Sequence, residues 1–386
     1  MTPVRFGIVG IGNIGNSHAP RFLDGRVPGA ELTAICDTDP ARLARFPQVK
    51  GWTDSAALIR SGEIDALLIA TPHYDHVPIG IDALNHGLHV LIEKPLAVHV
   101  ADCERLLAAH TDPKQVFGVM FNTRTVKRYQ KLHELLRSGE LGRIRRINWI
   151  LTDWFRSEAY YRSSPWRATW DGEGGGILVN QLPHDLDLFQ WMFGLPKRVR
   201  AFCPLGKHHD IEVEDEINAL MEFEDGATAV MVATTGEAPG TDRREIITDR
   251  GRVLVLADRL EWTRTEMSVE VFNRTTTEGF AAPKSEVVTI PVDPTPAGQH
   301  TEVIQRFVGA IHEGTPLIAP ATEGTASVAL ANAIILSSWQ DRTVELPLDA
   351  AAFEAALNER RRHSRYRPGI PPTTSAVVDM TASFRP

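Results

Sequence analysis

The chain has 386 residues, of which 43% are hydrophobic and 23% are charged, and its formal net charge is -8. Single hydrophobic cores rarely grow beyond about 250–300 residues, so this length favours two domains. The excess of acidic residues argues against a nucleic-acid binder, which needs a basic surface, and no apolar run is long enough to cross a membrane as a helix. We therefore expect neither nucleic acid nor a membrane as a partner.

The N-terminal segment contains a motif typical of dinucleotide-binding domains. An apolar run, VRFGIV, leads into GIGNIG, a helix-like stretch follows, and a second apolar run ends in Asp37, 22 residues past Gly15. In such motifs the glycines permit a tight turn, close approach of a pyrophosphate and close packing of helix and strand. Asp37 would bind the adenosine ribose and repel a 2′-phosphate, which favours NAD over NADP. The loop residues predicted to bind the cofactor are Gly10, Gly12, Asn13, Ile14 and Gly15.

Strands and helices continue to alternate up to about residue 122. The runs EIDALLIATP, LHVLIEKPLA and QVFGVMFN read as buried strands, with helical segments between them. This alternation predicts a parallel, doubly wound sheet, whose ligands bind at the carboxyl ends of the strands. We therefore expect a Rossmann dinucleotide-binding domain over residues 1–122. The residues expected near its cofactor crevice are Asp37, Thr71, Pro72, His73, Glu93, Lys94, Asn122 and Arg124.

Lys94 ends a buried strand and precedes a proline, which restrains it to an extended backbone and so fixes its direction. The segments GIVGIGNIG, IATPHYDH and GLHVLIEKPLA together resemble the Gfo/Idh/MocA family of nicotinamide-dependent oxidoreductases, over roughly residues 3–346. The resemblance implies that Lys94 contacts both the substrate alcohol and the cofactor. It also implies that His73 and His76 lie near the cofactor, although both also fit a purely structural role.

The pattern changes over residues 123–348. A helix closed by Gly142 is followed by strand-like runs that include SVEVFNR, at residues 268–274, and by a probable hairpin turn, EDGA. This predicts an α+β domain with a large, mostly antiparallel sheet that is covered by helices on one face only, so that the whole chain is of the α/β class. The resemblance implies that the open face pairs with another subunit, in a homodimer or homotetramer.

The segment EGGGILVNQLPHDLDLFQW, residues 173–191, carries polar residues at helical spacing. Pro183 is costly inside a helix, so we expect a helix that begins at Asn180, a favourable N-cap, or one that begins near the glycines and kinks. We expect the glycines to let a ligand approach closely. Taken alone, the pattern also fits a core helix whose His184 and Asp187 merely face solvent.

The resemblance gives this segment a chemical role. It implies that His184 is the general base and that Asp187 binds substrate hydroxyls. The family carries an aspartate four residues ahead of the histidine, where this chain has Asn180. Asparagine orients a hydroxyl but carries neither a proton nor a negative charge, which places more of the acid–base work on His184 and Lys94.

Aromatic and arginine residues are dense in TDWFRSEAYYRSSPWRATW, residues 152–170. They suit a carbohydrate site, with Trp154 and Tyr161 on the substrate and, by the resemblance, Trp166 and Arg167 near the nicotinamide. The same residue types are also enriched at subunit interfaces, and their spacing does not separate the two interpretations.

The remaining features concern the cellular compartment, a metal site and the C-terminal segment. Three cysteines form no CxxC pair, which fits a reducing cytoplasm. No metal site is predicted, because His184 and Asp187 lack further ligands. Residues 349–386 read as a helix followed by a proline-rich segment, which is either a loose tail or an arm around a neighbouring subunit.

We therefore expect an NAD-dependent dehydrogenase that oxidises a ring secondary alcohol of a sugar, glycoside, anhydrosugar or cyclitol. One alternative is a redox-neutral lyase, epimerase or glycoside-cleaving enzyme that retains NAD. Another is a non-catalytic NAD-binding regulatory protein, which only Asn180 favours. The predicted catalytic residues are Lys94, His184 and Asn180. The predicted substrate-binding residues are Lys94, Asn122, Arg124, Trp154, Tyr161, Asn180, His184 and Asp187.

Overall fold

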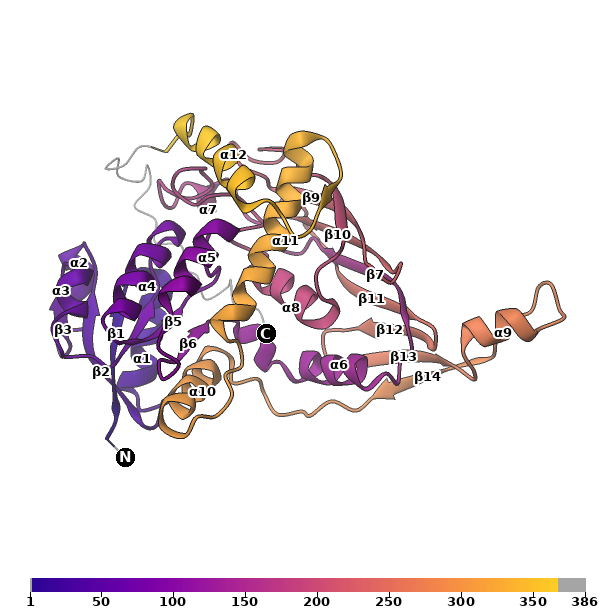
Figure 1. Cartoon of the computed structure of the whole chain (residues 1–386), viewed down its shortest axis with the longest axis horizontal. Helices are drawn as coiled ribbons and strands as arrows, with labels where there is room; N and C mark the ends of the chain where they lie inside the picture. Colours follow the sequence, from indigo (N-terminus) through magenta and orange to yellow (C-terminus); the bar gives the residue numbers. More distant parts are fainter. Residues whose placement is uncertain (1, 367–386) are drawn as a thin grey trace.

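The computed structural model describes residues 2–366 and contains two sheets side by side (Figure 1). The first is a six-stranded parallel sheet in the order β3-β2-β1-β4-β5-β6. Its strands are β1 (Val4–Val9), β2 (Ala30–Cys36), β3 (Lys50–Trp52), β4 (Ala66–Ile69), β5 (His89–Ile92) and β6 (Phe117–Val119). The order reverses between β1 and β4, and a ligand crevice lies at the carboxyl ends of the strands at such a point. This confirms the predicted Rossmann fold.

Helices cover both faces of this sheet (Figure 1). The short helices between its strands are α1 (Asn13–Leu23), α2 (Pro40–Leu43), α3 (Ser55–Ile59), η1 (His73–Asp75), α4 (His76–Asn85), α5 (Val100–Ala109) and, after β6, η2 (Asn122–Thr125). A helix from much later in the chain, α10 (Gln299–Glu313), also packs here: its Ile304 and Phe307 lie in one buried cluster with Phe6 and Ile8 of β1. Residues predicted to belong to the second domain therefore complete the core of the first.

The second sheet has nine strands in the order β14-β13-β12-β11-β7-β10-β9-β8-β15. Only the β7–β10 pair is parallel, and the other pairs of this sheet are antiparallel. Its strands are β7 (Ile144–Leu151), β8 (Arg198–Phe202), β9 (Glu216–Glu222), β10 (Thr228–Thr234), β11 (Asp242–Thr248), β12 (Gly251–Val255), β13 (Leu260–Thr265), β14 (Ser285–Ile290) and β15 (Val344–Glu345). The β9–β10 hairpin at EDGA is as predicted.

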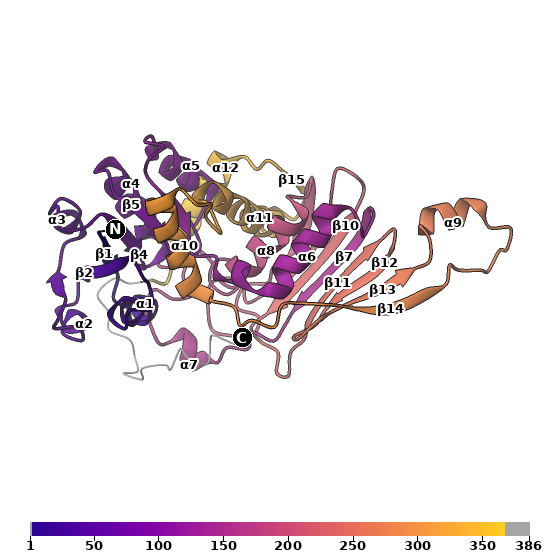
Figure 2. The same cartoon turned by 90° about the horizontal axis from the view of Figure 1, so that it is seen from below.

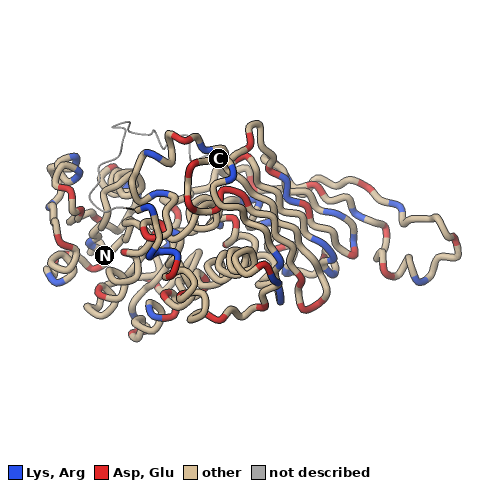
Figure 3. The backbone as a smooth tube through the Cα atoms, turned by 90° about the horizontal axis from the view of Figure 1, so that it is seen from above, with Lys and Arg blue, Asp and Glu red and all other residues tan. Residues whose placement is uncertain are grey.

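Helices α6 (Lys127–Ser138), α8 (Pro183–Phe193) and α11 (Ala321–Gln340) lie on one face of the large sheet (Figure 2). Along β9, buried and exposed residues alternate, as expected when one face is covered and the other is not. The uncovered side leaves Phe202 and Leu220 more than half exposed. Charged residues of both signs are interspersed along these strands (Figure 3).

Two predicted elements differ in the structure. The helix after residue 123 ends at Gly139, whose φ of 75° is the left-handed geometry of a helix C-cap, rather than at Gly142. The run SVEVFNR is not a strand but the helix α9 (Val269–Thr275), which projects from the body of the molecule between β13 and β14 (Figure 1). Ser268 caps it by accepting the N–H of Val271, and local capping here outweighs the β-branched residues of the run.

The C-terminal helix α12 (Ala350–Arg362) forms as predicted. The second domain also contains a short helix, α7 (Glu158–Tyr161). Residues 367–386, on which the tail-or-arm prediction falls, lie outside the described residues. Within residues 2–366, no helix combines the length and the apolar character that a membrane span requires. Cys36, Cys103 and Cys203 are buried and free.

Candidate active site

The glycine loop fits a dinucleotide. A Cβ atom on Gly10, whose φ is 90°, would lie 2.6 Å from the backbone of Ala70, and one on Gly15 would lie 1.9 Å from the carbonyl oxygen of Gly10. A Cβ on Gly12 would meet nothing closer than Arg42, at 4.0 Å. No side chain caps the start of α1 at Gly12. The loop is thus tight where the protein packs on itself and open where N–H groups can receive phosphate oxygens.

Asp37 braces this loop from the end of β2. It is buried, its Oδ2 accepts the N–H of Ile11 at 2.7 Å, and its Oδ1 accepts the N–H of Asp39 at 2.9 Å. Arg42 lies 3.3 Å from the same carboxylate and is half exposed. The acid therefore sits against the glycine loop, as its predicted role on the ribose requires.

Among the residues that follow β4 and β6, some polar side-chain atoms have hydrogen-bond partners within the protein and others have none. Thr71 Oγ1 and Asn122 Oδ1 are buried and have no hydrogen-bond partner among the described residues, which fits groups that await a ligand. Nδ1 of His73 donates to the backbone oxygen of Glu173 at 3.1 Å, and its ring lies 6.3 Å from that of Trp166. Pro72 precedes the η1 turn that carries His73.

His76 has a structural position. Both of its ring nitrogens face backbone oxygens, those of Pro95 at 2.9 Å and Thr71 at 3.1 Å, and the residue is fully buried. Burial lowers its pKa, so that the ring is neutral at physiological pH. Of the two roles considered for His76, the structure favours the structural one, since neither nitrogen faces a crevice.

Glu93 forms a buried pair with a histidine that sequence patterns did not reveal. Its Oε1 lies 2.7 Å from Nε2 of His18 on α1, and the ring of His300, on α10, lies 5.4 Å from that of His18. Burial raises the pKa of Glu93, but the hydrogen bond to His18 and the charges of His18, His300 and Lys94 outweigh it and bring the pKa to about 2. Glu93 is therefore a charged group beneath Lys94 and contributes no free oxygen of its own to the crevice.

Lys94 connects the two domains. Its Nζ donates to the backbone oxygen of Asn180 at 2.8 Å. Burial lowers the pKa of Lys94, while the charges of Glu93 and Glu173 oppose that shift. The ammonium group is thereby held at the carboxyl end of β5, against the segment that leads into α8.

The helix α8 begins at Pro183, which occupies its first position, where a proline loses no intrahelical hydrogen bond. The predicted start at Asn180 and the predicted kink are both wrong. Asn180 lies in a turn before the helix, where its N–H donates to the oxygen of Gly176 at 3.0 Å. It therefore does not share a helical face with His184 and reaches the site through the turn instead.

His184 stands in the first turn of α8 and is half-buried. Burial, and then the charge of Lys94, hold the pKa of His184 well below its usual range. Its Nδ1 is buried with no hydrogen-bond partner among residues 2–366. A neutral imidazole beside a lysine is a group that can accept a proton from an alcohol.

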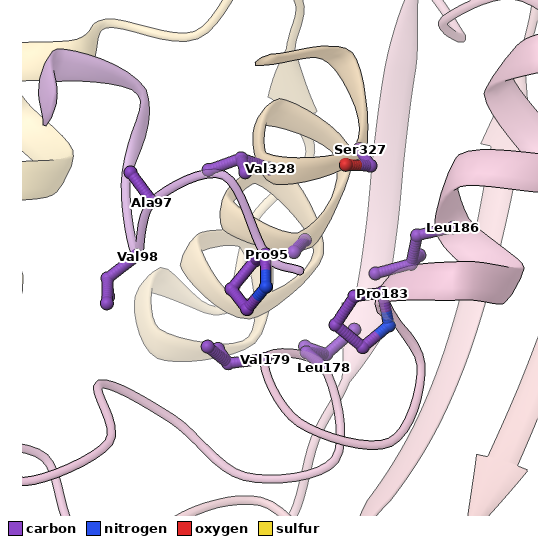
Figure 4. Close-up of a pocket in the computed structure, with 10 residues that line it drawn as sticks. Pro95, Ala97, Val98, Leu178, Val179, Pro183, Leu186, Ser327 and Val328 are labelled. Carbon is purple, nitrogen blue, oxygen red and sulfur yellow. The ribbon is translucent and has the colours of Figure 1, made fainter. Parts of the chain in front are cut away.

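The contact between the domains fixes these groups relative to one another. Pro95, which follows Lys94, faces Pro183 and Leu186 of α8 and Val328 of α11 around a small cavity of about 10 Å³ (Figure 4). The lining is apolar except for Ser327, and the space holds at most about one water molecule. This is interdomain packing behind the site, and it holds the Lys94 turn against the start of α8.

The glycines at 174–176 serve the protein and not a ligand. A Cβ on Gly176 would lie 1.9 Å from the carbonyl oxygen of Glu214, and one on Gly174, whose φ is 88°, would lie 2.3 Å from Val98. The expectation that these glycines let a ligand approach is therefore wrong, because protein atoms occupy the space.

Asp187 and Arg124 are bound to each other. Two hydrogen bonds of 2.7 Å join the guanidinium to the carboxylate, and the side chains are 1% and 0% exposed. Gln190 also donates to Asp187 at 2.9 Å, and Arg124 pairs with Glu323. The expected substrate contacts of Asp187 and Arg124 are contradicted by this geometry, since neither side chain presents a free group to a ligand.

We expect Asp187→Asn to reduce stability rather than substrate affinity. Breaking one partner of a buried ion pair costs about 3–5 kcal/mol, because the other charge stays buried. Urea unfolding of Asp187→Asn should show this loss, whereas Glu323→Gln, which removes a half-exposed partner of the same Arg124, should cost less than about 1 kcal/mol. If Asp187→Asn kept wild-type stability and only raised the KM for substrate, Asp187 would be a substrate-binding residue.

Most of the aromatic side chains described from residues 152–170 make contacts within the protein. Tyr161 is buried and its hydroxyl lies 2.7 Å from Thr235 Oγ1, so that its predicted contact with substrate is not open in this structure. Trp154 is half-buried with the guanidinium of Arg156 5.4 Å from its ring. The guanidinium of Arg167 lies 4.8 Å from the ring of Trp166.

Sequence patterns missed a carboxylate beside Asn180. Glu173, which is 1% exposed, accepts the side-chain amide of Asn180 through Oε1 and the N–H of Ala168 at 2.6 Å through Oε2. Arg167 lies 3.9 Å from Oε1. The available signal was an acid immediately before three glycines. Within the described part of the chain, no three His, Cys, Asp or Glu side chains gather as a metal site would require.

Comparison with known proteins agrees with this architecture. Residues 4–121 match the family described as "Oxidoreductase family, NAD-binding Rossmann fold", and residues 129–254 match the "GFO/IDH/MocA C-terminal domain". A 1-carboxy-3-chloro-3,4-dihydroxycyclo hexa-1,5-diene dehydrogenase of Comamonas testosteroni is 32% identical over 58% of this chain and 56% of that protein. An inositol 2-dehydrogenase of Salmonella paratyphi B is 27% identical over 59% of this chain and 66% of that protein. The matched regions thus span less than two thirds of either relative.

Solved structures show the same two-sheet arrangement. The WlbA dehydrogenase from Bordetella pertussis, in complex with NADH and UDP-GlcNAcA, superposes with a TM-score of 0.75 and 26% identity, covering 90% of this chain and 100% of that one. Levoglucosan dehydrogenase, at 22% identity and a TM-score of 0.69, shares the fold. Because the two family matches follow one another along the chain over the two sheets described above, this chain belongs to the Gfo/Idh/MocA family of oxidoreductases and carries its NAD-binding Rossmann domain.

Proposed function

We propose that this protein is an NAD-dependent dehydrogenase that oxidises a ring secondary alcohol of a sugar, glycoside, anhydrosugar or cyclitol. The observation that carries the proposal is the convergence of Lys94 with Asn180 and His184 at the end of the Rossmann sheet. Lys94 bonds the backbone of Asn180 at 2.8 Å and its charge acts on His184. Relatives named for an inositol and for a cyclic dihydroxy compound support the substrate class.

The chain's own residues would divide the work as follows. The glycine loop and Asp37 bind the cofactor, which supplies the hydride acceptor when bound. Lys94 donates to the alcohol oxygen and stabilises the negative charge that develops on it. His184, neutral at physiological pH, takes the hydroxyl proton. Asn180 and Asn122 orient hydroxyl groups of the ring.

A substrate panel tests the proposal. Purified protein with NAD would be offered hexoses, glycosides, anhydrosugars and inositols, and NADH formation would be followed. Accumulation of NADH with one of these classes supports a dehydrogenase. Conversion of a substrate without net NADH would support the redox-neutral alternative, and NAD binding without conversion of any compound would support a regulatory role.

The choice of cofactor gives a separate prediction. Asp37→Ser removes the carboxylate that would accept ribose hydroxyls and repel a 2′-phosphate, and it leaves Arg42 beside the loop. Loss of a hydrogen bond to a charged group should weaken NAD binding about ten- to a hundredfold. NADP binding should weaken less or improve, which titration of both cofactors would measure. An unchanged ratio of the two affinities would remove Asp37 from the ribose site.

We also propose that the uncovered face of the large sheet pairs with a second copy, in a homodimer or homotetramer. Helices α6, α8 and α11 lie on one face of the sheet only (Figure 2). Phe202 and Leu220 are exposed, and buried and exposed residues alternate along the β9 strand that carries Leu220. Exposed apolar residues on a sheet face favour association. Light scattering of the purified protein would give the assembly mass.

A further inference from the structure

Four side chains form a closed network around the turn that precedes α8. Arg167 donates to the hydroxyl of Tyr160 at 2.6 Å, and that hydroxyl lies 3.5 Å from Oδ1 of Asn180. The side-chain amide of Asn180 donates to Glu173, and Glu173 lies 3.9 Å from Arg167, which closes the ring. Three of the four residues, Arg167, Tyr160 and Glu173, are buried.

The network fixes the orientation of the Asn180 amide. Oε2 of Glu173 accepts the backbone N–H of Ala168 and Oε1 accepts the Asn180 amide, so both oxygens act as acceptors. Burial raises the pKa of Glu173, while the charge of Arg167, these two hydrogen bonds and the charge of Lys94 oppose that shift. An ionised carboxylate accepts hydrogen bonds only, so Asn180 must turn its NH₂ toward Glu173 and its Oδ1 the other way. That oxygen has a long contact with Tyr160, which leaves it able to accept a stronger bond from a hydroxyl donor.

The same network acts on Lys94. The backbone oxygen of Asn180 accepts Lys94 Nζ at 2.8 Å, so a side chain that anchors Asn180 also anchors the ammonium group. The negative charge of Glu173 favours the charged form of Lys94. Glu173, which contacts Asn180 and not the ammonium group of Lys94 directly, therefore supplies the negative charge that Asn180 itself lacks.

Resting on the proposed function, we propose that Glu173 is a positioning residue that holds Asn180 and, through it, Lys94. The negative charge therefore resides on Glu173, which holds the NH₂ of Asn180 and leaves its Oδ1 as the acceptor for a substrate hydroxyl. A substrate hydroxyl opposite Asn180 is accordingly a donor to Oδ1. The unit of recognition is the Glu173–Asn180 pair rather than the asparagine alone.

A charge swap tests this. In Glu173→Gln the buried partner gains a donor, so Asn180 can turn over and the charge is lost; kcat/KM should fall about tenfold or more, the effect of losing a hydrogen bond to a charged group. Asn180→Asp alone should also lower it, because it brings two carboxyls into contact. The double variant Glu173→Gln/Asn180→Asp restores one carboxylate and one amide in contact, and we expect it to recover to within about threefold of wild type.

A matched control separates this pairing from a general loss of buried charge. Glu214 is a buried carboxyl that accepts the N–H groups of Gly176 and Leu178 at 2.9 and 3.2 Å, in the same glycine segment but without contact with the Asn180 side chain. Combining Glu214→Gln with Asn180→Asp should give no recovery. Equal recovery in both double variants, or a double variant worse than either single one, would overturn the proposal.

The dependence of stability on pH tests the pair without any substrate. Two adjacent carboxyls in Asn180→Asp should raise the pKa of one of them, so that the folded protein holds a proton that the unfolded chain releases. Stability is then present at low pH and lost as the pH rises through the raised pKa. The Tm of Asn180→Asp should fall relative to wild type between about pH 5 and pH 8, and the Glu173→Gln/Asn180→Asp variant should not show this fall.

The other titratable groups near Glu173 are the same in all variants of that comparison, so their contributions to the difference in Tm cancel. They are Arg167, Lys94, His73, Glu214 and Tyr161. A difference in Tm between Asn180→Asp and wild type that does not change with pH would overturn the contact between the two side chains. Absence of turnover in wild type would instead count against the proposed dehydrogenase and would leave the thermal result to decide the role of Glu173.

Discussion

Replacing His184 with alanine is expected to lower kcat by about 10²- to 10⁴-fold, the usual contribution of a general base, while NAD affinity changes little. The side chain stands at the start of α8 in the second domain, whereas the glycine loop precedes α1 in the Rossmann domain, so the nucleotide contacts should survive. NADH formation would give the turnover, and fluorescence titration would give the NAD dissociation constant.

The pH profile adds a second readout. Burial and the charge of Lys94 hold the pKa of His184 well below its usual range, so its base form persists as the pH falls below about 6.5. The acid limb of kcat/KM in wild type should therefore lie below that pH, and the limb should disappear from the residual rate of His184→Ala.

A matched histidine controls for packing effects. His133, on α6, stacks on Trp191 of α8 with ring centroids 3.9 Å apart, so that His133→Ala disturbs the same helix two turns beyond His184. It should keep wild-type turnover. If His184→Ala retained near-normal turnover, or lost NAD binding as well, His184 would be a structural residue and the proton acceptor would lie elsewhere.

The parts of the site that the sequence predicted correctly are those built from local contacts. The turn at Gly10, the start of α1 and the end of β2 at Asp37 lie within one βαβ unit, so their spacing along the chain determines their geometry. The strand–helix alternation likewise predicts a parallel sheet, because only crossover connections join parallel strands.

The missed contacts are those between residues far apart in the chain. Arg124 and Asp187 are separated by 63 residues, and nothing in either segment reveals that each neutralises the other. His18 and Glu93 are 75 residues apart for the same reason. A polar residue at a strand end looks the same in a sequence whether it faces a ligand or a partner in the core.

The prediction for the segment before α8 was wrong for a different reason. The helical spacing of polar residues predicts that Asn180 and His184 share one helix, but the first helical residue is Pro183. Asn180 therefore lies in a turn, where its neighbours are set by loop geometry instead of by a period of 3.6 residues. Glu173 enters the site only because of that turn, so no helical pattern would have brought it there.

Lys94→Met is expected to lower kcat/KM by about 10²- to 10³-fold, the effect of removing one preorganised electrostatic donor from an active site. Methionine nearly preserves the length and the buried stem of the side chain but removes the ammonium group that bonds the oxygen of Asn180. Lys94→Arg keeps the charge, yet its planar fork does not fit a single acceptor in the same way, so we expect only partial activity.

The pH dependence and a control sharpen this prediction. Burial lowers the pKa of Lys94, so the charged form that assists catalysis should be lost, and the rate should fall, at a lower pH than for a free lysine. That alkaline limb should be absent from the residual activity of Lys94→Met. Lys114→Met, at an exposed position of the same domain, should leave rate and profile unchanged. Near-normal kcat/KM in Lys94→Met would refute the proposed mechanism, because no other described cation bonds the Asn180 turn through its backbone oxygen.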